Sequence, residues 1–335
     1  MEVYKIVLTG GPCSGKTSVI ESLEEKLSEA GYYVITVQET ASELIRANML
    51  PKEDYNHTLK FQETVLRLQS LKEDNAESYA NYAKIDKPVI ILYDRAIMDN
   101  SAYFQNEEDF DTMINKYSLN GINLIDKYDL IINLISLASL KKELYENDSV
   151  RREDATLASM RDKKTSQAWM LSENMRIVKP KETLEEKIDF VYEMITDFVN
   201  KKSLSNPKIK EIDINNSDFT IYNPLNSKKI EVNEYTSGED KIYERIYKGS
   251  KSYILKKKEK NNNSDECNSI STKLDNETFA EILKKETTHE TNSYCSISFI
   301  DSNFDLFRIE YNDKHGIVKT YNDSAEIPSN IKVLK

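Results

Sequence analysis

Cysteine is scarce in this sequence, and long apolar stretches are missing from it. The three cysteines, Cys13, Cys267 and Cys295, are widely spaced and form no CxxC pair. Neither a disulfide framework nor a zinc site is therefore expected, and a reducing compartment fits best. No apolar run reaches the roughly 18 residues that span a bilayer, and the start at Met1 lacks the features of a signal peptide. We expect a cytoplasmic protein, with peripheral attachment to membranes left open.

Basic residues are outnumbered by acidic ones. The chain has 46 Lys and Arg against 57 Asp and Glu, which gives a formal net charge of −11. Such a charge opposes general attraction to nucleic acid or to an anionic membrane, so a contact of this kind needs a local basic patch. We predict no nucleic-acid partner, and the length of 335 residues indicates two folded units.

The first 200 residues or so alternate short apolar runs with long amphipathic ones. This alternation is typical of an α/β fold, a parallel sheet with helices on both faces. The glycine at position 31 lies just beyond the first expected helix, as a helix end requires. The expected strands are 3–9, 33–38, 89–93, 129–134 and 175–178, and the expected helices are 16–29, 58–83 and 183–199.

The character of the sequence changes after residue 206. Segments rich in Tyr, Ile and Thr are separated by polar turns, and 276–285 is the one convincing helix. We therefore predict a first domain at 1–203 and a β-rich second domain at 207–335. The polar, Asn-rich stretch 260–269 is expected to be a flexible loop between strands.

A phosphate-binding loop is the strongest motif. The sequence from Gly10 to Thr17 fits GxxxxGK[ST] and lies between an expected strand and an expected helix. Lys16 should contact the β and γ phosphates of a nucleotide, and Thr17 should bind Mg²⁺. The predicted nucleotide-binding residues are Gly10, Gly11, Pro12, Cys13, Ser14, Gly15, Lys16, Thr17 and Ser18.

Charged residues follow two of the expected strands. Asp94 ends the strand 89–93, where a carboxylate can steer the metal ion, and Arg95 could hold substrate or phosphate. An ordinary salt bridge at the strand end is the alternative.

Glu39 follows the second strand and is either a base or substrate contact, or a surface residue at a helix start. Asp99 is either part of this set or a solvated acid. The predicted catalytic residues are Lys16, Glu39, Asp94 and Arg95, with Thr17 and Asp94 as metal ligands.

Two further segments are basic. Arg151, Arg152 and Arg161 follow the fourth expected strand, and they suggest a lid that closes over the triphosphate. A solvated helix is the alternative. The range 241–260 contains eight Lys or Arg and two acids. If it forms a strand, Lys256 and Lys258 share one face, which could bind the phosphate of a lipid or polyphosphate or could be an exposed edge that resists aggregation.

The first 200 residues resemble the NadR/TTD-like AAA ATPase family, named for the nucleotide kinase domain of NadR and for the TRPL translocation defect proteins. The resemblance is carried by GGPCSGKTS from Gly10, QETASELI from Gln38 and YDRAIMDNSAY from Tyr93, with Trp169, Asn174 and Arg176. It implies a P-loop domain that binds GTP.

The second half resembles the β-rich, CYTH-like (triphosphate-tunnel-like) domain of the same proteins. The matching segments are YERIYKGSKSYILKKKEK from Tyr243, STKLDNETFAEILKK from Ser271 and FDLFRIEYND from Phe304. The resemblance implies binding of an anionic phospholipid (phosphatidic acid or a phosphoinositide) and a role in trafficking. The paired glutamates of an ExExK metal site, which tunnel triphosphatases use, are absent from the start of this domain. The resulting set of anion-binding candidates is Arg245, Lys248, Lys256 and Lys258.

These observations leave several functions open. The leading hypothesis is a nucleotide switch that binds Mg-GTP or Mg-ATP, hydrolyses it slowly and senses a phosphorylated lipid headgroup. The alternatives are a small-molecule kinase of the nucleoside type, with Glu39 or Asp94 as base, and a second domain that binds protein instead of lipid. No NKxD motif decides between GTP and ATP.

Overall fold

The computed structural model describes two compact units. The described residues are 2–52, 54–136, 155–200, 207–220, 222, 227–260, 267–285, 288–322 and 324–334. The first unit comprises Met1–Asn120, Tyr128–Trp169 and Glu173–Ile195, and the second comprises Gly121–Lys127, Met170–Ser172 and Thr196–Lys335. Three segments that the sequence assigned to the first domain are thus part of the second unit, namely Gly121–Lys127, Met170–Ser172 and the end of the predicted domain from Thr196.

A parallel sheet forms the centre of the first unit. Its described strands have the order β2-β3-β1-β4-β5, and every neighbouring pair is parallel. The strands β3 and β4 are buried along their whole length, as their continuous apolar sequences require in a sheet covered on both faces. The strand bounds are Val3–Thr9 (β1), Tyr33–Val37 (β2), Val89–Asp94 (β3), Leu130–Leu134 (β4) and Met175–Val178 (β5).

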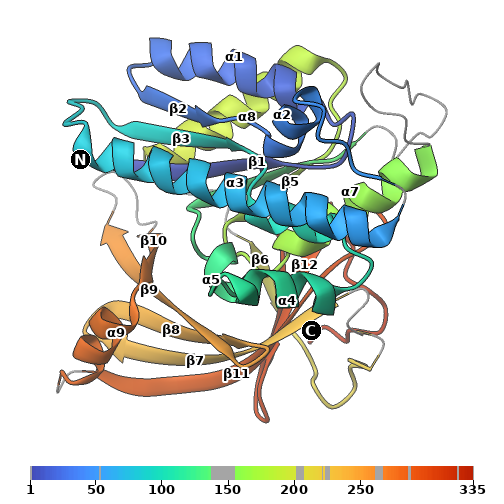
Figure 1. The fold of residues 1–335 in the computed structure, drawn as a ribbon. Helices are drawn as coiled ribbons and strands as arrows, with labels where there is room; N and C mark the ends of the chain where they lie inside the picture. Colours follow the sequence, from blue (N-terminus) through green and yellow to red (C-terminus); the bar gives the residue numbers. More distant parts are fainter. Residues whose placement is uncertain are drawn as a thin grey trace. The chain divides into compact units, whose positions relative to one another are not determined.

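Helices cover both faces of this sheet. In Figure 1, α1 and α3 lie on opposite sides of the strands, which is the arrangement that right-handed crossovers produce around a strand order that reverses at β1. The helix α1 buries Val19, Ile20, Leu23 and Leu27, residues at helical spacing. The bounds are Lys16–Glu29 (α1), Thr40–Arg46 (α2), Tyr55–Tyr82 (α3), Ile97–Tyr103 (the 3₁₀ helix η1), Glu107–Lys116 (α4), Ala155–Trp169 (α7) and Leu184–Val199 (α8).

The second unit is built on an antiparallel sheet. Within the described part of the chain its order is β10-β9-β8-β7-β11-β12-β13-β6. The bounds are Lys208–Glu211 (β6), Ser227–Ser237 (β7), Asp240–Tyr247 (β8), Ser250–Lys260 (β9), Cys267–Leu274 (β10), Thr288–Ile300 (β11), Leu306–Tyr311 (β12) and Gly316–Thr320 (β13), with helices Gly121–Ile125 (α5) and Asn276–Leu283 (α9). The α/β first unit and a β-rich second sheet are thus both present as predicted.

Two apolar clusters stabilise the second sheet. One gathers around Phe307 and Ile309 on β12. The other lies where α9 covers the strands, with Phe279 of α9 against Ile242 of β8. The ring of Phe279 stacks on that of Tyr253 at a centroid distance of 3.9 Å, so Tyr253 is a packing residue.

Element bounds agree closely with the sequence, with one clear correction. The range 260–269 was expected to be a loop, yet Lys260 ends β9 and Cys267 begins β10. Lys260 and Cys267 pair directly across the two strands, and residues 261–266 lie outside the described part. A polar composition therefore does not prevent strand pairing at an edge. Among the described helices, none combines the length and apolar character needed to cross a bilayer.

Asp129 makes the stability of the first unit depend on pH. Burial raises the pKa of its carboxyl group to about 6, while the Lys5 amide, which donates to Oδ2 at 2.7 Å, and the Lys5 charge oppose this rise. The folded protein therefore holds this proton more tightly than the unfolded chain does. The stabilising contribution is complete below about pH 4 and is lost as the pH rises through about 6.

We predict that Asp129→Asn, which resembles the protonated carboxyl group, removes this dependence. Between about pH 4 and pH 7, the free energy of unfolding of the variant should rise by about 3 kcal/mol relative to wild type, since the pKa shift is roughly two units. Urea unfolding at fixed ionic strength measures this difference, with exposed Asp86→Asn as the control. Parallel curves for wild type and Asp129→Asn would contradict the assignment.

Candidate functional site

The loop between β1 and α1 depends on glycine at defined points. Gly10 has a φ of 139° and Gly15 a φ of 80°, values that glycine adopts without steric cost. A Cβ on Gly10 would lie 2.1 Å from the carbonyl oxygen of Leu134, so no larger residue fits without moving β4. Gly15 immediately precedes α1, and the positive N-terminal end of that helix is therefore directed at the loop.

Lys16 lies across the loop. Its Nζ atom donates to the carbonyl oxygens of Gly10 and Gly11, both at 2.9 Å, and to Oγ of Ser14 at 3.1 Å. The side chain is buried, with a residue exposure of 5%. These bonds hold the ammonium group of Lys16 within the loop at the start of α1; its contact with phosphate stays a prediction of the motif.

Two side chains that the sequence analysis did not select also hold the loop. Asp162 of α7 is fully buried; its Oδ1 accepts from the Gly11 amide at 2.6 Å and its Oδ2 from the Ser136 amide at 3.0 Å. Lys187 of α8 donates to the carbonyl oxygen of Ser14 at 3.2 Å. These residues lie 151 and 173 positions from their loop partners, and no local sequence pattern connects positions so far apart.

Asp94 and Thr17, the two predicted magnesium ligands, lie on elements that adjoin the loop. Asp94 ends β3 and pairs in register with Leu8 of β1, two positions before Gly10, and Thr17 is exposed in the first turn of α1. The described residues contain no cluster of three or more His, Cys, Asp or Glu that could hold a metal. Mg²⁺ does not need one, because it commonly uses one or two protein ligands, substrate phosphates and water.

Glu39 and Arg95 form an ion pair at the same edge of the sheet. Nε of Arg95 donates to Oε1 of Glu39 at 2.8 Å, and the side chains are only 8% and 13% exposed. Ser42 donates its hydroxyl to Oε2 of Glu39 at 2.6 Å. The interpretation of Glu39 as a surface residue is therefore wrong, and the partner of Arg95 in this pair is Glu39 rather than its neighbour Asp94.

Arg95 has an unusual environment. Its backbone is left-handed, with a φ of 66°. Burial lowers the pKa of its guanidinium group, but Tyr103 and the carboxylates of Glu39, Asp99 and Asp94 raise it, and the net direction is upward. The group therefore stays charged. Its Nη1 atom is buried and has no hydrogen-bond partner among the residues that the structure describes, which leaves a donor for an anionic ligand.

Asp99 is buried, so its interpretation as a solvated acid is wrong. It accepts from the hydroxyl of Thr9, from the amide of Ala96 at 2.8 Å and from Nε1 of Trp169 at 3.3 Å. Burial raises the pKa of this carboxyl group, against the lowering effect of Arg95 and of these hydrogen bonds. Asp99 thus joins β1, η1 and α7 beneath the loop, and Trp169 has a role as its donor.

The predicted lid lies only partly within the described residues. Arg151 and Arg152 fall outside them. Arg161 belongs to α7, and its guanidinium group lies over the ring of Tyr103 at 4.8 Å. Its neighbour Asp162 contacts the loop, so α7 brings a carboxylate to the loop where the sequence suggested a basic lid.

The basic strand β9 places lysines on one face of the second sheet. Lys256 pairs directly with Lys241 of β8, and Lys273 of β10 pairs with Ile254, so all of these positions share a face. We call it the lysine face. Position 258 shares it by the alternation of β9, although the side chain of Lys258 lies outside the described part.

Two other predicted anion-binding residues have partners of their own. Arg245 is 2% exposed; it forms an ion pair with Asp126 and donates to the carbonyl oxygen of Leu171. A guanidinium group enclosed in this way does not face a lipid headgroup, and Arg245 is removed from the candidates. Lys248 lies in the turn after β8, with Nζ 5.3 Å from the centre of the Tyr247 ring.

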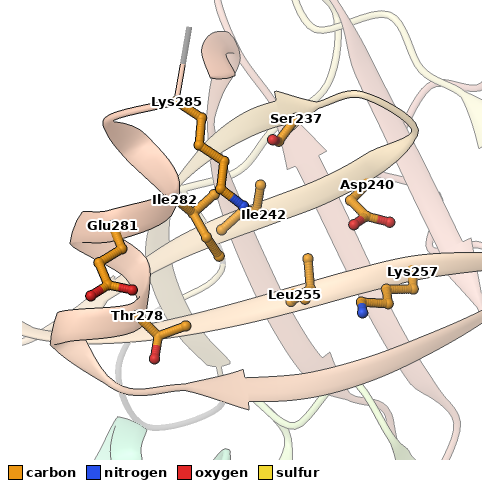
Figure 2. Close-up of a pocket in the computed structure, with 9 residues that line it drawn as sticks. All are labelled: Ser237, Asp240, Ile242, Leu255, Lys257, Thr278, Glu281, Ile282 and Lys285. Carbon is orange, nitrogen blue, oxygen red and sulfur yellow. The ribbon is translucent and has the colours of Figure 1, made fainter. Parts of the chain in front are cut away.

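The opposite face of the same strands contains a cavity of about 290 Å³. Figure 2 shows α9 along one side of it, with Thr278, Glu281 and Lys285 opposite Asp240 and Lys257. Its apolar residues are Ile242, Leu255 and Ile282. The charges at its rim are of both signs, so the cavity shows no preference for an anion.

The contact between Gly11 and Asp162 gives a prediction. A Cβ on Gly11 would lie 2.5 Å from Cβ of Asp162 and 2.7 Å from its Oδ1. Gly11→Ala should therefore lower the free energy of unfolding by about 1–3 kcal/mol. Gly121→Ala is the control, because nothing lies within 4 Å of its added Cβ, and thermal unfolding should show it unchanged. Equal stability of the two variants would exclude the close approach.

The comparison with known proteins agrees with this geometry. A family model described as an AAA domain matches residues 5–187. The match begins within β1, covers the loop, Asp94, Asp162 and Lys187, and ends within α8. No curated protein matches the chain. More than half of the sequence is covered by the family model, and the chain belongs to the AAA domain family.

Proposed function

We propose that the protein is a regulatory switch that binds Mg-GTP or Mg-ATP at the loop 10–17 and hydrolyses it slowly. The observation that carries this proposal is Lys16, held across a glycine loop at the N-terminal end of α1 in a domain of the AAA family. Main-chain amides of such a loop converge on phosphate oxygens, and the helix end favours the same negative charge. A nucleoside triphosphate is the ligand with the matching chemistry.

The surrounding residues supply the remaining parts of this site. Thr17 and Asp94 would hold Mg²⁺, which neutralises charge on the β and γ phosphates. Glu39 accepts hydrogen bonds from Arg95 and Ser42, which hold its carboxylate at the edge of the sheet where ligands of such folds bind.

We further propose that the lysine face binds an anionic phospholipid, with phosphatidic acid or a phosphoinositide as the headgroup. Lys256 and Lys241 are direct neighbours across two strands, and like charges in this arrangement destabilise a sheet. Glu234 offsets part of this repulsion, since it accepts from Lys241 at 2.7 Å, and Nζ of Lys256 lies 4.8 Å from the centre of the Tyr243 ring. An external phosphate would reduce the repulsion further. Such a contact suits a cytoplasmic protein that attaches peripherally to membranes and acts in trafficking.

A small-molecule kinase of the nucleoside type is the second candidate. The environment of Arg95 favours the kinase. Its guanidinium group is buried beside Glu39, and its Nη1 atom lies at the sheet edge where the substrate that accepts the phosphate would bind. In this alternative Glu39 or Asp94 accepts the proton of the substrate hydroxyl, and Arg95 holds the phosphate. The two candidates differ in whether the phosphate is transferred to water or to a substrate.

We predict that Lys16→Ala weakens the binding of GTP and ATP by about 10- to 100-fold, the effect of removing a charged hydrogen bond to phosphate. Calorimetry with Mg²⁺ measures this, and chelation of the metal should weaken binding by wild type. Lys26→Ala, an exposed site on the same helix, is the control. Unchanged affinity in Lys16→Ala would defeat the proposal, and labelled product with nucleosides or nicotinamide riboside would favour the kinase.

For the second unit, we predict that Lys256→Glu with Lys258→Glu abolishes flotation with vesicles that contain phosphatidic acid. The control is Lys257→Glu with Lys284→Glu. It changes the charge equally, but Lys257 lies on the opposite face by the alternation of β9 and Lys284 caps α9. Equal flotation of the two double variants would reject the lysine face, and failure of wild type to float would reject lipid binding altogether.

A further inference from the structure

Lys187 lies in the first turn of α8, and its side chain contacts the phosphate-binding loop. Its Nζ atom donates to the carbonyl oxygen of Ser14 at 3.2 Å and lies 3.8 Å from the point where a Cβ on Gly15 would be. The residue is 8% exposed. We propose that Lys187 is a second phosphate-binding lysine, which contacts the polyphosphate chain of the nucleotide beside Lys16. This inference rests on the proposed nucleotide binding.

No carboxylate among the described residues forms an ion pair with Lys187. In the same part of the chain, its side chain makes one hydrogen bond, the bond to Ser14. An ammonium group has three donors, so two are left. Burial lowers the pKa of Lys187, and no neighbouring charge acts in the opposite direction. The nearest acid in sequence, Glu186, accepts from the amides of Glu182 and Thr183 at the start of the helix.

Lys187 lies at the start of a helix, where a positive charge without a paired carboxylate among the described residues is unfavourable. A cation in the first turn of a helix opposes the helix dipole, which favours negative charge at that end. Lys16 also bonds to Ser14, through its hydroxyl, so two ammonium groups converge on one loop residue. The carboxylate that reaches the loop, Asp162, bonds to Gly11 instead. A polyphosphate chain carries enough negative charge to compensate both ammonium groups.

The alternative is a purely structural lysine that ties α8 to the loop. Both interpretations require the bond to Ser14, but they differ in the effect of ligands. A phosphate contact predicts a loss of affinity for any polyphosphate, with or without a nucleoside. A structural tie predicts a loss of stability, because a bond between two elements would be removed without compensation.

The test compares Lys187→Met, which keeps the length of the side chain, with Lys187→Arg, which keeps its charge. The control is Lys26→Met, an exposed lysine on α1. Calorimetry measures binding of Mg-GTP, Mg-ATP and inorganic tripolyphosphate to the full chain. Lys187→Met should weaken all three by about 10- to 100-fold, Lys187→Arg should recover most of the affinity, and Lys26→Met should stay within about two-fold of wild type.

Each other outcome has a definite meaning. If wild type binds no triphosphate, the nucleotide proposal itself fails. If wild type binds and Lys187→Met binds equally well, only the assignment of Lys187 fails. If Lys187→Met loses affinity for GTP or ATP but keeps its affinity for tripolyphosphate, Lys187 contacts the base or the sugar. This result would also overturn the proposal. Thermal unfolding should show Lys187→Met as stable as wild type, since a buried charge without a paired carboxylate is removed. A loss of stability with unchanged affinity would favour the structural tie and overturn the proposal. If Lys187→Met does not fold, Lys187→Gln takes its place in the same titrations, with the same loss of affinity expected.

Discussion

The close approach of the backbone at residues 10 and 11 to its neighbours is the constraint on which the first unit depends. The position of a Cβ on Gly10 is taken by the carbonyl oxygen of Leu134, and that of Gly11 by the side chain of Asp162. The loop is therefore packed against β4 and α7 as tightly as a backbone without side chains allows. This packing gives the loop a fixed shape, so a ligand would not have to supply the free energy needed to order it.

The sequence predicts local features of this arrangement and not its distant contacts. The strand from Val3 to Thr9 and the helix from Lys16 to Glu29 have the expected bounds, because apolar spacing and the glycine motif act over a few residues. Asp162 stood in a segment interpreted as a basic lid, and Lys187 in an ordinary amphipathic helix. Their partners are set by the crossovers that bring α7 and α8 back to the loop, and these crossovers leave no signal in either local sequence.

Cations in the second unit show a related limit. The alternation of a strand assigns Lys256 and Lys258 to one face, but it does not say what covers each face. Arg245 is covered by the segment that contains Asp126 and by the carbonyl oxygen of Leu171, both more than 70 residues earlier in the chain. A count of basic residues therefore overestimates the number that can contact a ligand. Only the partners of each cation separate the structural ones from the others.

The same criterion separates the buried cations of the first unit. The guanidinium group of Arg95 has Glu39 as its ion-pair partner, and burial of the two charges together limits the desolvation penalty. Lys187 is buried to a similar degree, at 8% against 6% exposure for Arg95, yet its contact is a neutral carbonyl oxygen. A chain with a net charge of −11 has many acids that could serve as its partner. That none of the described acids does so, beside a loop shaped for anions, is the physical basis for assigning this charge to the ligand.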